Sequence, residues 1–188
     1  MPIQGWENAN VLTPDDVMAG VIPKGLVVVF DDDNYYMGSV VAEKLLRAEY
    51  DVTFVTPAGK VCEWAYTTDE QTRAQAMLIS LGVHLETGTV VQSLAGDKVT
   101  LACAYTGRRR DVEAASVVMV TSREPRDALY HALCERIEIM RVGDCSAPGI
   151  IASAVYSGHR YARAMDVDSS CGNFRRERAV VPPKSVSV

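Results

Sequence analysis

The sequence lacks the features that mark several classes of protein. Its 188 residues include only 5 cysteines and 3 histidines, and these form no C-x-x-C pair and no zinc-type spacing. No apolar run approaches the ~20 residues of a membrane span, and the first residues lack the basic and apolar regions of a signal peptide. The formal charge of -5 argues against a nucleic-acid partner. These absences predict a cytoplasmic protein with reduced thiols, no bound metal, and neither nucleic acid nor membrane as a partner.

The most informative absence lies between the first long apolar segment and the helix that follows it. Residues 26–30 predict a buried parallel strand, residues 37–48 a helix and residues 51–55 a second parallel strand. A dinucleotide-binding unit of this kind carries G-x-G-x-x-G in its first turn, so that the backbone can approach a pyrophosphate. The order of elements is therefore that of a Rossmann-like unit, but the glycine pattern is missing.

Acidic residues stand in place of that pattern. The turn contains Asp31, Asp32 and Asp33, whose carboxylates would repel a diphosphate and whose side chains would block its approach. The acidic ribose-binding residue expected after the second strand is also missing, because that place reads Val55-Thr56-Pro57. The sequence therefore predicts that a nicotinamide cofactor does not bind here.

The predicted fold class is α/β: a Rossmann-like three-layer unit, made of a parallel sheet with flanking helices, that contains an antiparallel β insert. Capping boxes at Thr13 and Thr68 predict two helix starts, and residues 116–121 are predicted to rejoin the parallel sheet. The predicted organisation is a lead-in with a short helix at 1–25, the Rossmann-like unit at 26–138 with its β meander at about 83–114, a closing strand (139–142) and helix (148–165) at 139–166, and a tail at 167–188.

Other candidate sites have simpler structural interpretations. The three histidines, His84, His131 and His159, are far apart in the sequence, and Cys145 has no basic partner nearby. Arg108-Arg109-Arg110 is interpreted as a solvated hairpin end, and the three aspartates as a turn that binds no Mg²⁺ or Ca²⁺. The aromatic residues flanking the turn are expected to fill the former cofactor cleft by packing; they are Tyr35, Tyr36, Trp64 and Tyr66.

Several segments in combination resemble a known family. Leu12-Thr13-Pro14-Asp15-Asp16-Val17-Met18, Asp33-Asn34-Tyr35-Tyr36-Met37, Arg141-Val142-Gly143-Asp144-Cys145 and Gly172-Asn173-Phe174 are similar to the C-terminal region of the trimethylamine, dimethylamine and histamine dehydrogenases. These proteins are relatives of dienoyl-CoA reductase within the NADH:flavin oxidoreductases. The resemblance covers roughly the whole chain.

The resemblance implies that the redox cofactors lie outside this chain. The family's FMN barrel, its 4Fe-4S segment and its first G-x-G-x-x-G half have no counterpart here, so FMN and 4Fe-4S would lie on other domains or on a flavoprotein partner chain. By position, Gly143 and Asp144 would contact ADP or FAD, and 139–166 would close that nucleotide domain; Asp144 as a simple helix cap is the alternative.

Three functions follow from these observations. The first is a noncatalytic module or subunit of a flavin-dependent amine dehydrogenase-like oxidoreductase. The second is an autonomous protein that binds ADP or FAD, and the third is a homodimeric Rossmann-like scaffold. No residue of this chain is predicted to be catalytic.

Overall fold

A computed structural model describes residues 3–8 and 10–165 of the chain. The chain divides into two compact units, Met1–Ser122 (unit 1) and Arg123–Val188 (unit 2), and each is described by itself. The sequence placed its boundary later, between residues 138 and 139. The predicted tail at 167–188, with Gly172-Asn173-Phe174, lies outside the described residues.

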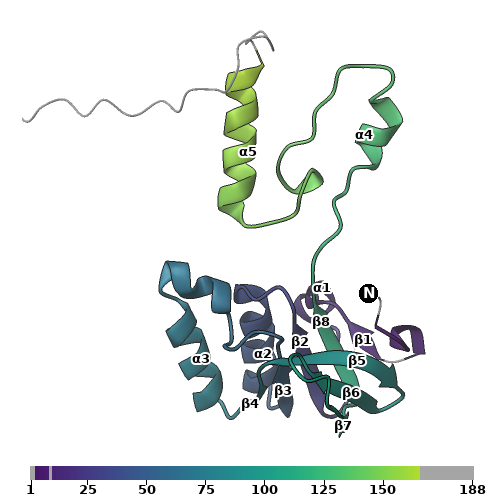
Figure 1. The fold of residues 1–188 in the computed structure, drawn as a ribbon, viewed down its shortest axis with the longest axis vertical. Helices are drawn as coiled ribbons and strands as arrows, with labels where there is room; N and C mark the ends of the chain where they lie inside the picture. Colours follow the sequence, from purple (N-terminus) through teal and green to yellow (C-terminus); the bar gives the residue numbers. More distant parts are fainter. Residues whose placement is uncertain (1–2, 9, 166–188) are drawn as a thin grey trace, which may run out of the picture. The chain divides into compact units, whose positions relative to one another are not determined.

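Unit 1 is built on a five-stranded parallel sheet with the strand order β1-β8-β2-β3-β4 (Figure 1). The central strand β2 pairs in parallel with both neighbours, so that Phe30 lies between Val55 and Met119. The predicted parallel strands and the return of residues 116–121 to this sheet are confirmed. The strands are β1 (Val11–Leu12), β2 (Val27–Asp31), β3 (Val52–Val55), β4 (His84–Glu86) and β8 (Ser116–Val120).

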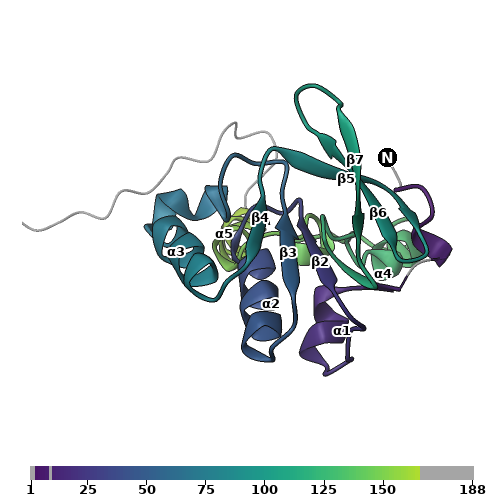
Figure 2. The same cartoon turned by 90° about the horizontal axis from the view of Figure 1, so that it is seen from below.

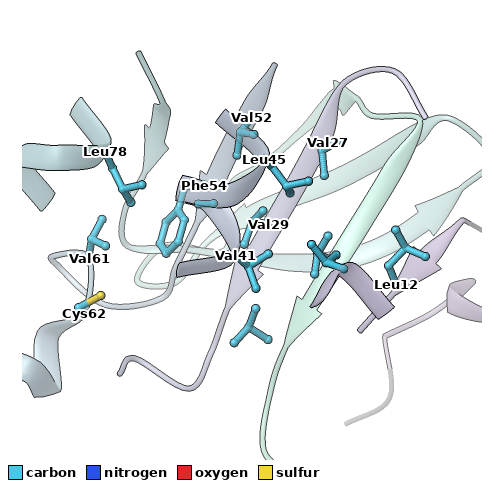
Figure 3. Close-up of a cluster of buried hydrophobic side chains, with 14 of the residues drawn as sticks. Leu12, Val27, Val29, Val41, Leu45, Val52, Phe54, Val61, Cys62 and Leu78 are labelled. Atoms are coloured by element: carbon cyan, nitrogen blue, oxygen red, sulfur yellow. The ribbon is translucent and has the colours of Figure 1, made fainter. Parts of the chain in front are cut away.

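Three helices cover one face of this sheet: α1 (Pro14–Met18), α2 (Tyr36–Arg47) and α3 (Gln71–Ser80). Because side chains alternate between the two faces of a strand, Val29 and Phe54 point toward the helices, where they join Val41 and Leu78 in one buried core (Figure 3). Burying a side chain as large as that of Phe54 stabilises the fold by roughly 3 kcal/mol.

An antiparallel sheet covers the other face. Its strands are β5 (Thr89–Ala95), β6 (Lys98–Cys103) and β7 (Arg109–Glu113), in that order. Figure 2 shows these three strands beside the parallel sheet. Val28 and Phe30, which alternate with the residues facing the helices, pack against Leu94 and Leu101 in a second core. The predicted insert is thus the third layer of unit 1, and helices flank only one face of the parallel sheet.

The predicted β meander began too early in the sequence. Residues His84–Glu86 form β4, which pairs in parallel with β3 and is the edge of the parallel sheet. The apolar pattern of a three-residue strand does not predict which sheet the strand joins, because this depends on which other strand it pairs with in the folded protein. The antiparallel pairing begins only at Thr89.

Of the two predicted capping boxes, one is present. Thr13 accepts the N–H of Asp16 with its hydroxyl, and the carboxylate of Asp16 accepts the N–H of Thr13. The box at Thr68 is wrong, because Thr68 ends the 3-10 helix η2 (Glu63–Thr68) and its hydroxyl donates to the carbonyl of Ala65. A second 3-10 helix, η1 (Trp6–Asn8), lies near the N-terminus.

Unit 2 contains α4 (Ala128–Leu133), the 3-10 helix η3 (Gly143–Cys145) and α5 (Ile151–Ala164). The predicted helix at 148–165 is confirmed, but the predicted strand at 139–142 is wrong, because these residues pair with no neighbouring strand and a ladder needs a partner. None of residues 123–165 is buried. Within the described part of the chain, no helix has the length and apolar character needed to cross a membrane.

Candidate functional site

The candidate site is the turn that joins β2 to α2 at the carboxyl end of the parallel sheet, where doubly wound folds bind their ligands. Read with the spacing of G-x-G-x-x-G, Asp33 and Tyr35 occupy the first two glycine positions and Gly38 the third. In that motif the first two glycines make the turn tight and let a pyrophosphate approach, and the third lets the helix pack closely on the strand. Only the packing position has kept its glycine.

The structure shows why Gly38 must be small. A Cβ atom at this position would lie 2.5 Å from the Cγ of Asp31 and 2.7 Å from its Oδ2. Gly38 is in α2 and Asp31 is the last residue of β2, so this contact sets how closely the helix approaches the strand. The carboxyl of Asp31 therefore fills the space beneath the start of the helix.

Asp31 is fully buried. Its Oδ1 accepts the N–H of Asn34 at 3.1 Å, whereas its Oδ2 is the one buried side-chain oxygen or nitrogen without a hydrogen-bond partner among residues 3–8 and 10–165. Burial raises the pKa of Asp31 to about 7, although the N–H groups of Asn34 and Asp33 oppose this rise and the charges of Asp33 and Asp32 add to it. Near neutral pH the protonated and the charged form of this carboxyl are therefore both present.

The turn thus already has a hydrogen-bond acceptor for its N–H groups within the chain, the carboxyl of Asp31. In a nucleotide-binding turn, N–H groups beside a helix start would face a phosphate. Here the N–H of Asn34 faces the carboxyl of Asp31, and the side chains of Asp32 and Asp33 lie exposed beside it. Partial burial raises the pKa of Asp32, and the charge of Asp33 adds to the effect. A diphosphate at this turn would meet carboxylates instead of free N–H groups.

Asn34 connects the turn to its surroundings. Its backbone is left-handed, with φ of 57°, a conformation that asparagine tolerates better than most residues. Its carbonyl accepts the N–H of Trp64 at 3.0 Å, and its Oδ1 accepts the hydroxyl proton of Thr56 at 3.1 Å. The ends of β2 and β3 and the start of η2 are therefore held together by one residue.

A cavity of about 650 Å³ opens beside this turn, between α2, η2 and α3. Tyr35, Ser39 and Cys62 line its end near the turn, and Met77 lines its wall on α3. Burial raises the pKa of the Cys62 thiol, hydrogen bonding to Ser39 opposes this rise, and the charge of Asp31 adds to it.

Of the aromatic residues predicted to fill the cleft, Trp64 and Tyr66 do not, whereas Tyr35 packs against the helix-side core. Trp64 and Tyr66 are 70% and 72% exposed, because η2 turns their side chains outward, a result that the sequence could not show. Tyr35 packs edge-to-face against Tyr36, with ring centroids 5.1 Å apart, and Tyr36 is itself half exposed.

The predicted nucleotide contacts Gly143 and Asp144 lie in η3, ahead of α5. The N–H of Gly143 donates to the hydroxyl of Ser157 at 2.7 Å, and Oδ1 of Asp144 accepts the N–H of Gly149 at 3.3 Å. Asp144 therefore closes the loop before α5, whose N-cap residue, Ile150, makes no side-chain hydrogen bond to the helix. The thiol of Cys145 donates to the carbonyl of Val142.

The remaining candidates are spread over the surface. His84 pairs with Glu86 at 2.8 Å, and Arg110 pairs with the same carboxylate at 2.5 Å. Partial burial raises the pKa of Glu86, but hydrogen bonds from Arg110 and His84 outweigh this effect, so that the pKa is lowered overall. His131 pairs with Asp127, 3.1 Å away. The described residues contain no group of three or more His, Cys, Asp or Glu side chains arranged to hold a metal ion.

Sequence reasoning missed the central feature of the site, which is the burial of one aspartate out of three. A partial signal existed, since Asp31 directly follows four apolar residues of a buried strand. Gly38, five residues after Asp33, was a second signal, because that spacing marks the packing glycine of the motif. Neither signal could show that Oδ2 of Asp31 would lack a partner.

Comparison with known proteins gives consistent matches. No protein-family model matches the chain. Dimethylamine dehydrogenase from Hyphomicrobium sp. (strain x) is 30% identical over 195 residues, which cover 88% of this chain and 26% of that protein. The chain thus spans about a quarter of the length of this curated relative.

Two solved structures are also similar. Histamine dehydrogenase from Rhizobium sp. 4-9 is 36% identical with a TM-score of 0.86, covering 97% of this chain and 30% of that one. The 6-hydroxypseudooxynicotine amine oxidase from Pseudomonas geniculata N1 is 35% identical with a TM-score of 0.83, covering 88% and 26%. The matched region is the C-terminal part of these proteins, which confirms the resemblance seen in the sequence.

Proposed function

Because this chain is homologous to the C-terminal region of the dimethylamine and histamine dehydrogenases, we propose that it is a noncatalytic module of a flavin-dependent amine dehydrogenase-like oxidoreductase. In this role it binds no nicotinamide cofactor. It contributes a rigid α/β body, and its unit 2 completes a nucleotide domain whose other half lies elsewhere. Flavin and iron–sulphur chemistry belong to the larger part of such an enzyme.

The observation that carries this proposal is the contrast in burial between the two units. Unit 1 has two buried cores, whereas residues 123–165 contain no buried side chain. The exposed side chains in α5 and just before it include Ile150, Ile151, Val155 and Tyr156. A 14-residue helix with such a surface is not stable alone in water, since most helical stability in proteins comes from packing of an apolar face. Unit 2 therefore needs a surface supplied from outside residues 123–165.

The turn after β2 supports the second part of the proposal. The buried carboxyl of Asp31 takes the N–H of Asn34, and Asp33 and Tyr35 replace the two glycines that a pyrophosphate needs. Asp32 and Asp33 add negative charge at the same place. Each of these features disfavours a nicotinamide dinucleotide.

An adenine nucleotide fits the start of α5 better. No side chain caps this helix, and the N–H of Ser153 donates to the carbonyl of Ile150, so the N–H groups of Ile151 and Ala152 would be the ones to face an anion such as the diphosphate of ADP or FAD. Gly143 has a left-handed φ of 65°, and Asp144 lies exposed beside it. These two residues would position the nucleotide, while the partner half would supply the remaining contacts.

The test is to tag the protein at its C-terminus in its native cells, purify it by the tag, and record its absorbance spectrum. Recovery of a yellow species, either joined to the chain or associated with it, would support the module. A colourless chain recovered alone or only with copies of itself would overturn the module and favour the scaffold.

A pair of variants makes this test specific. Ile151→Asn, at an 80% exposed position of α5, should abolish recovery of the yellow species. Ser153→Asn, two residues along and thus on the opposite side of the helix, should not, and neither variant adds a charge at the start of the helix. Calorimetric titration of the purified chain completes the test: NADH binding at micromolar Kd would contradict the proposed loss of the nicotinamide site, and ADP binding by the chain alone would favour the autonomous nucleotide-binding protein.

A further inference from the structure

The end of β2 combines features that suit a regulatory device. Asp31 is fully buried, one of its carboxyl oxygens has no partner, and a helix glycine without room for a Cβ atom lies directly over it. A charged carboxylate in this position loses its hydration and regains only hydrogen bonds to N–H groups of the turn. The neutral acid loses much less, so the closed arrangement favours the protonated form.

The groups around the carboxyl reinforce this preference. On its own turn, Asp32 and Asp33 are both acidic and both exposed. From the start of η2, the buried thiol of Cys62 faces the same region, and from α2 the nearest group is the backbone of Gly38. The N–H groups of Asn34 and Asp33 favour the charged carboxylate, but burial and the charges of Asp32 and Asp33 oppose that form and outweigh them.

The same carboxyl holds other parts of the structure in place. It fixes the N–H of Asn34, and Asn34 in turn receives the N–H of Trp64 in η2 and the hydroxyl of Thr56 after β3. Each of these two segments, the turn after β2 and the start of η2, contains a residue with left-handed backbone conformation: Asn34 at φ of 57° and Cys62 at φ of 52°. Release of Asp31 would free both segments and open the end of the cavity that Tyr35, Ser39 and Cys62 line.

We propose that Asp31 is a proton-dependent latch: with a proton on its carboxyl, residues 31–39 and 62–66 are held closed, and loss of that proton releases them together. The open state hydrates the carboxylate, which removes the reason for burying it. This device is independent of the module function, because it lies wholly within unit 1 and involves no nucleotide. Its effect is to make access to the cavity between α2, η2 and α3 depend on pH.

The direction and size of the effect follow from linkage. In the open state Asp31 is an ordinary aspartate with a pKa near its usual value of 3.8, whereas burial raises its pKa in the closed state to about 7. Opening releases a proton between these two values, so the open fraction rises roughly tenfold per pH unit there and levels off above pH ~7.

The experiment is hydrogen exchange of the full chain followed by mass spectrometry at pH 5.5, 6.5 and 7.5, with exchange times corrected for the intrinsic pH dependence of the amides. Peptides covering 31–39 and 62–66 should show extra opening that rises with pH, and peptides from β5 and β6 should not. Asp31→Asn should remove the extra pH dependence, because it keeps the size of the side chain but cannot ionise. Asp33→Asn, which removes a neighbouring exposed charge, should retain it.

Two results would overturn the latch. One is the same pH dependence in Asp31→Asn as in the natural sequence, and the other is an equal rise in the β5 and β6 peptides, which would mean that the whole unit responds. If Asp31→Asn does not fold, an NMR titration of the natural sequence decides the question by following the Asp31 carboxyl carbon together with the amides of 31–39 and 62–66. The latch predicts that these amides change with the same midpoint as the carboxyl; a carboxyl midpoint below about 5, or amides that do not change with the carboxyl, would contradict it.

Discussion

Unit 1 and the described part of unit 2 differ in almost every property that stabilises a fold. Unit 1 has a parallel sheet with a buried core on each face, and Val27, Val28 and Val29 of its central strand are fully buried. Residues 123–165 of unit 2 have two α-helices and a 3-10 helix but no strand and no buried side chain. The composition of the two regions does not predict this difference in burial, because both regions contain regular apolar segments.

The comparison teaches that an apolar pattern stabilises a structure only where a complementary surface is present. Residues 139–142 and α5 have the pattern of a strand and a covering helix, yet none of these residues is buried, and residues 123–165 contain no sheet that could cover them. Unit 1 contains both partners of each apolar face. We therefore expect unit 1 to unfold cooperatively and unit 2 to be ordered by its surroundings.

The largest expected effect comes from truncating the same residue type in both units. Leu78→Ala removes a fully buried side chain of the helix-side core and should lower the free energy of unfolding by about 2–5 kcal/mol, because a cavity remains. Leu129→Ala, at a 69% exposed position of α4, should change it by less than about 0.5 kcal/mol. Urea denaturation of the full chain followed by circular dichroism measures both values. Equal losses would contradict the proposed contrast between the units.

The second effect concerns pH and is confined to unit 1. Burial raises the pKa of Asp31 to about 7 in the folded protein, so the folded state binds a proton that the unfolded state has already released between pH ~4 and ~7. Stability is therefore highest at the acidic end of this window, falls as pH rises and is constant above it, with an upper limit of about 4 kcal/mol for the total change.

Thermal or urea denaturation between pH 5 and 8 would reveal this slope. Asp31→Asn should flatten it and should make the protein more stable than the natural sequence at pH 8. A stability curve that rises from pH 5 to 7 in the natural sequence and stays unchanged in Asp31→Asn would contradict the assignment. Other carboxyls contribute in both proteins, so the difference between the two curves is the quantity to compare.

A third comparison uses one glycine from a helix in each unit. Gly38→Ala should cost about 1–3 kcal/mol, since its Cβ would lie 2.5 Å from the Asp31 carboxyl carbon and the helix must shift. At Gly158 in α5, nothing lies within 4 Å of an added Cβ, so alanine there should raise helix content through its better propensity, by roughly 1 kcal/mol locally. Circular dichroism and denaturation distinguish the two outcomes, and a stabilising Gly38→Ala would show that the contact with Asp31 is loose.

The smallest effect concerns helix capping. The capping box of Thr13 and Asp16 begins α1, whose Val17 is buried in the helix-side core. Thr13→Ala should lower the free energy of unfolding by about 1 kcal/mol, measured by urea denaturation, and Thr13→Ser should restore most of this loss.

Helix α5 has no such cap, so Ile150→Asp should increase its helicity without changing the stability of unit 1. If Ile150→Asp lowers the stability of unit 1, the two units do not unfold independently.

The sequence by itself determined the α/β class, the parallel strands of the central sheet and the start of α1. These follow from local causes: runs of buried valines, residues such as Thr13 that cap a helix, and alternation along strands. It also determined the absence of the glycine pattern after β2, because that pattern is a matter of residue type and spacing. Gly143 and Asp144 lie in η3 ahead of α5, without the strand that was predicted before them, and their contact with a nucleotide stays a prediction.

Only the tertiary structure decided which sheet β4 joins, that residues 139–142 form no strand, and that Trp64 and Tyr66 face outward. It also decided that Asp31 is buried while Asp32 and Asp33 are exposed. Each of these depends on which distant segments meet: β4 on the edge of β3, residues 139–142 on a sheet partner, and Asp31 on the close approach of Gly38. Neighbours in the chain fix local conformation, but burial and strand pairing are set by surfaces that come together only when the chain folds.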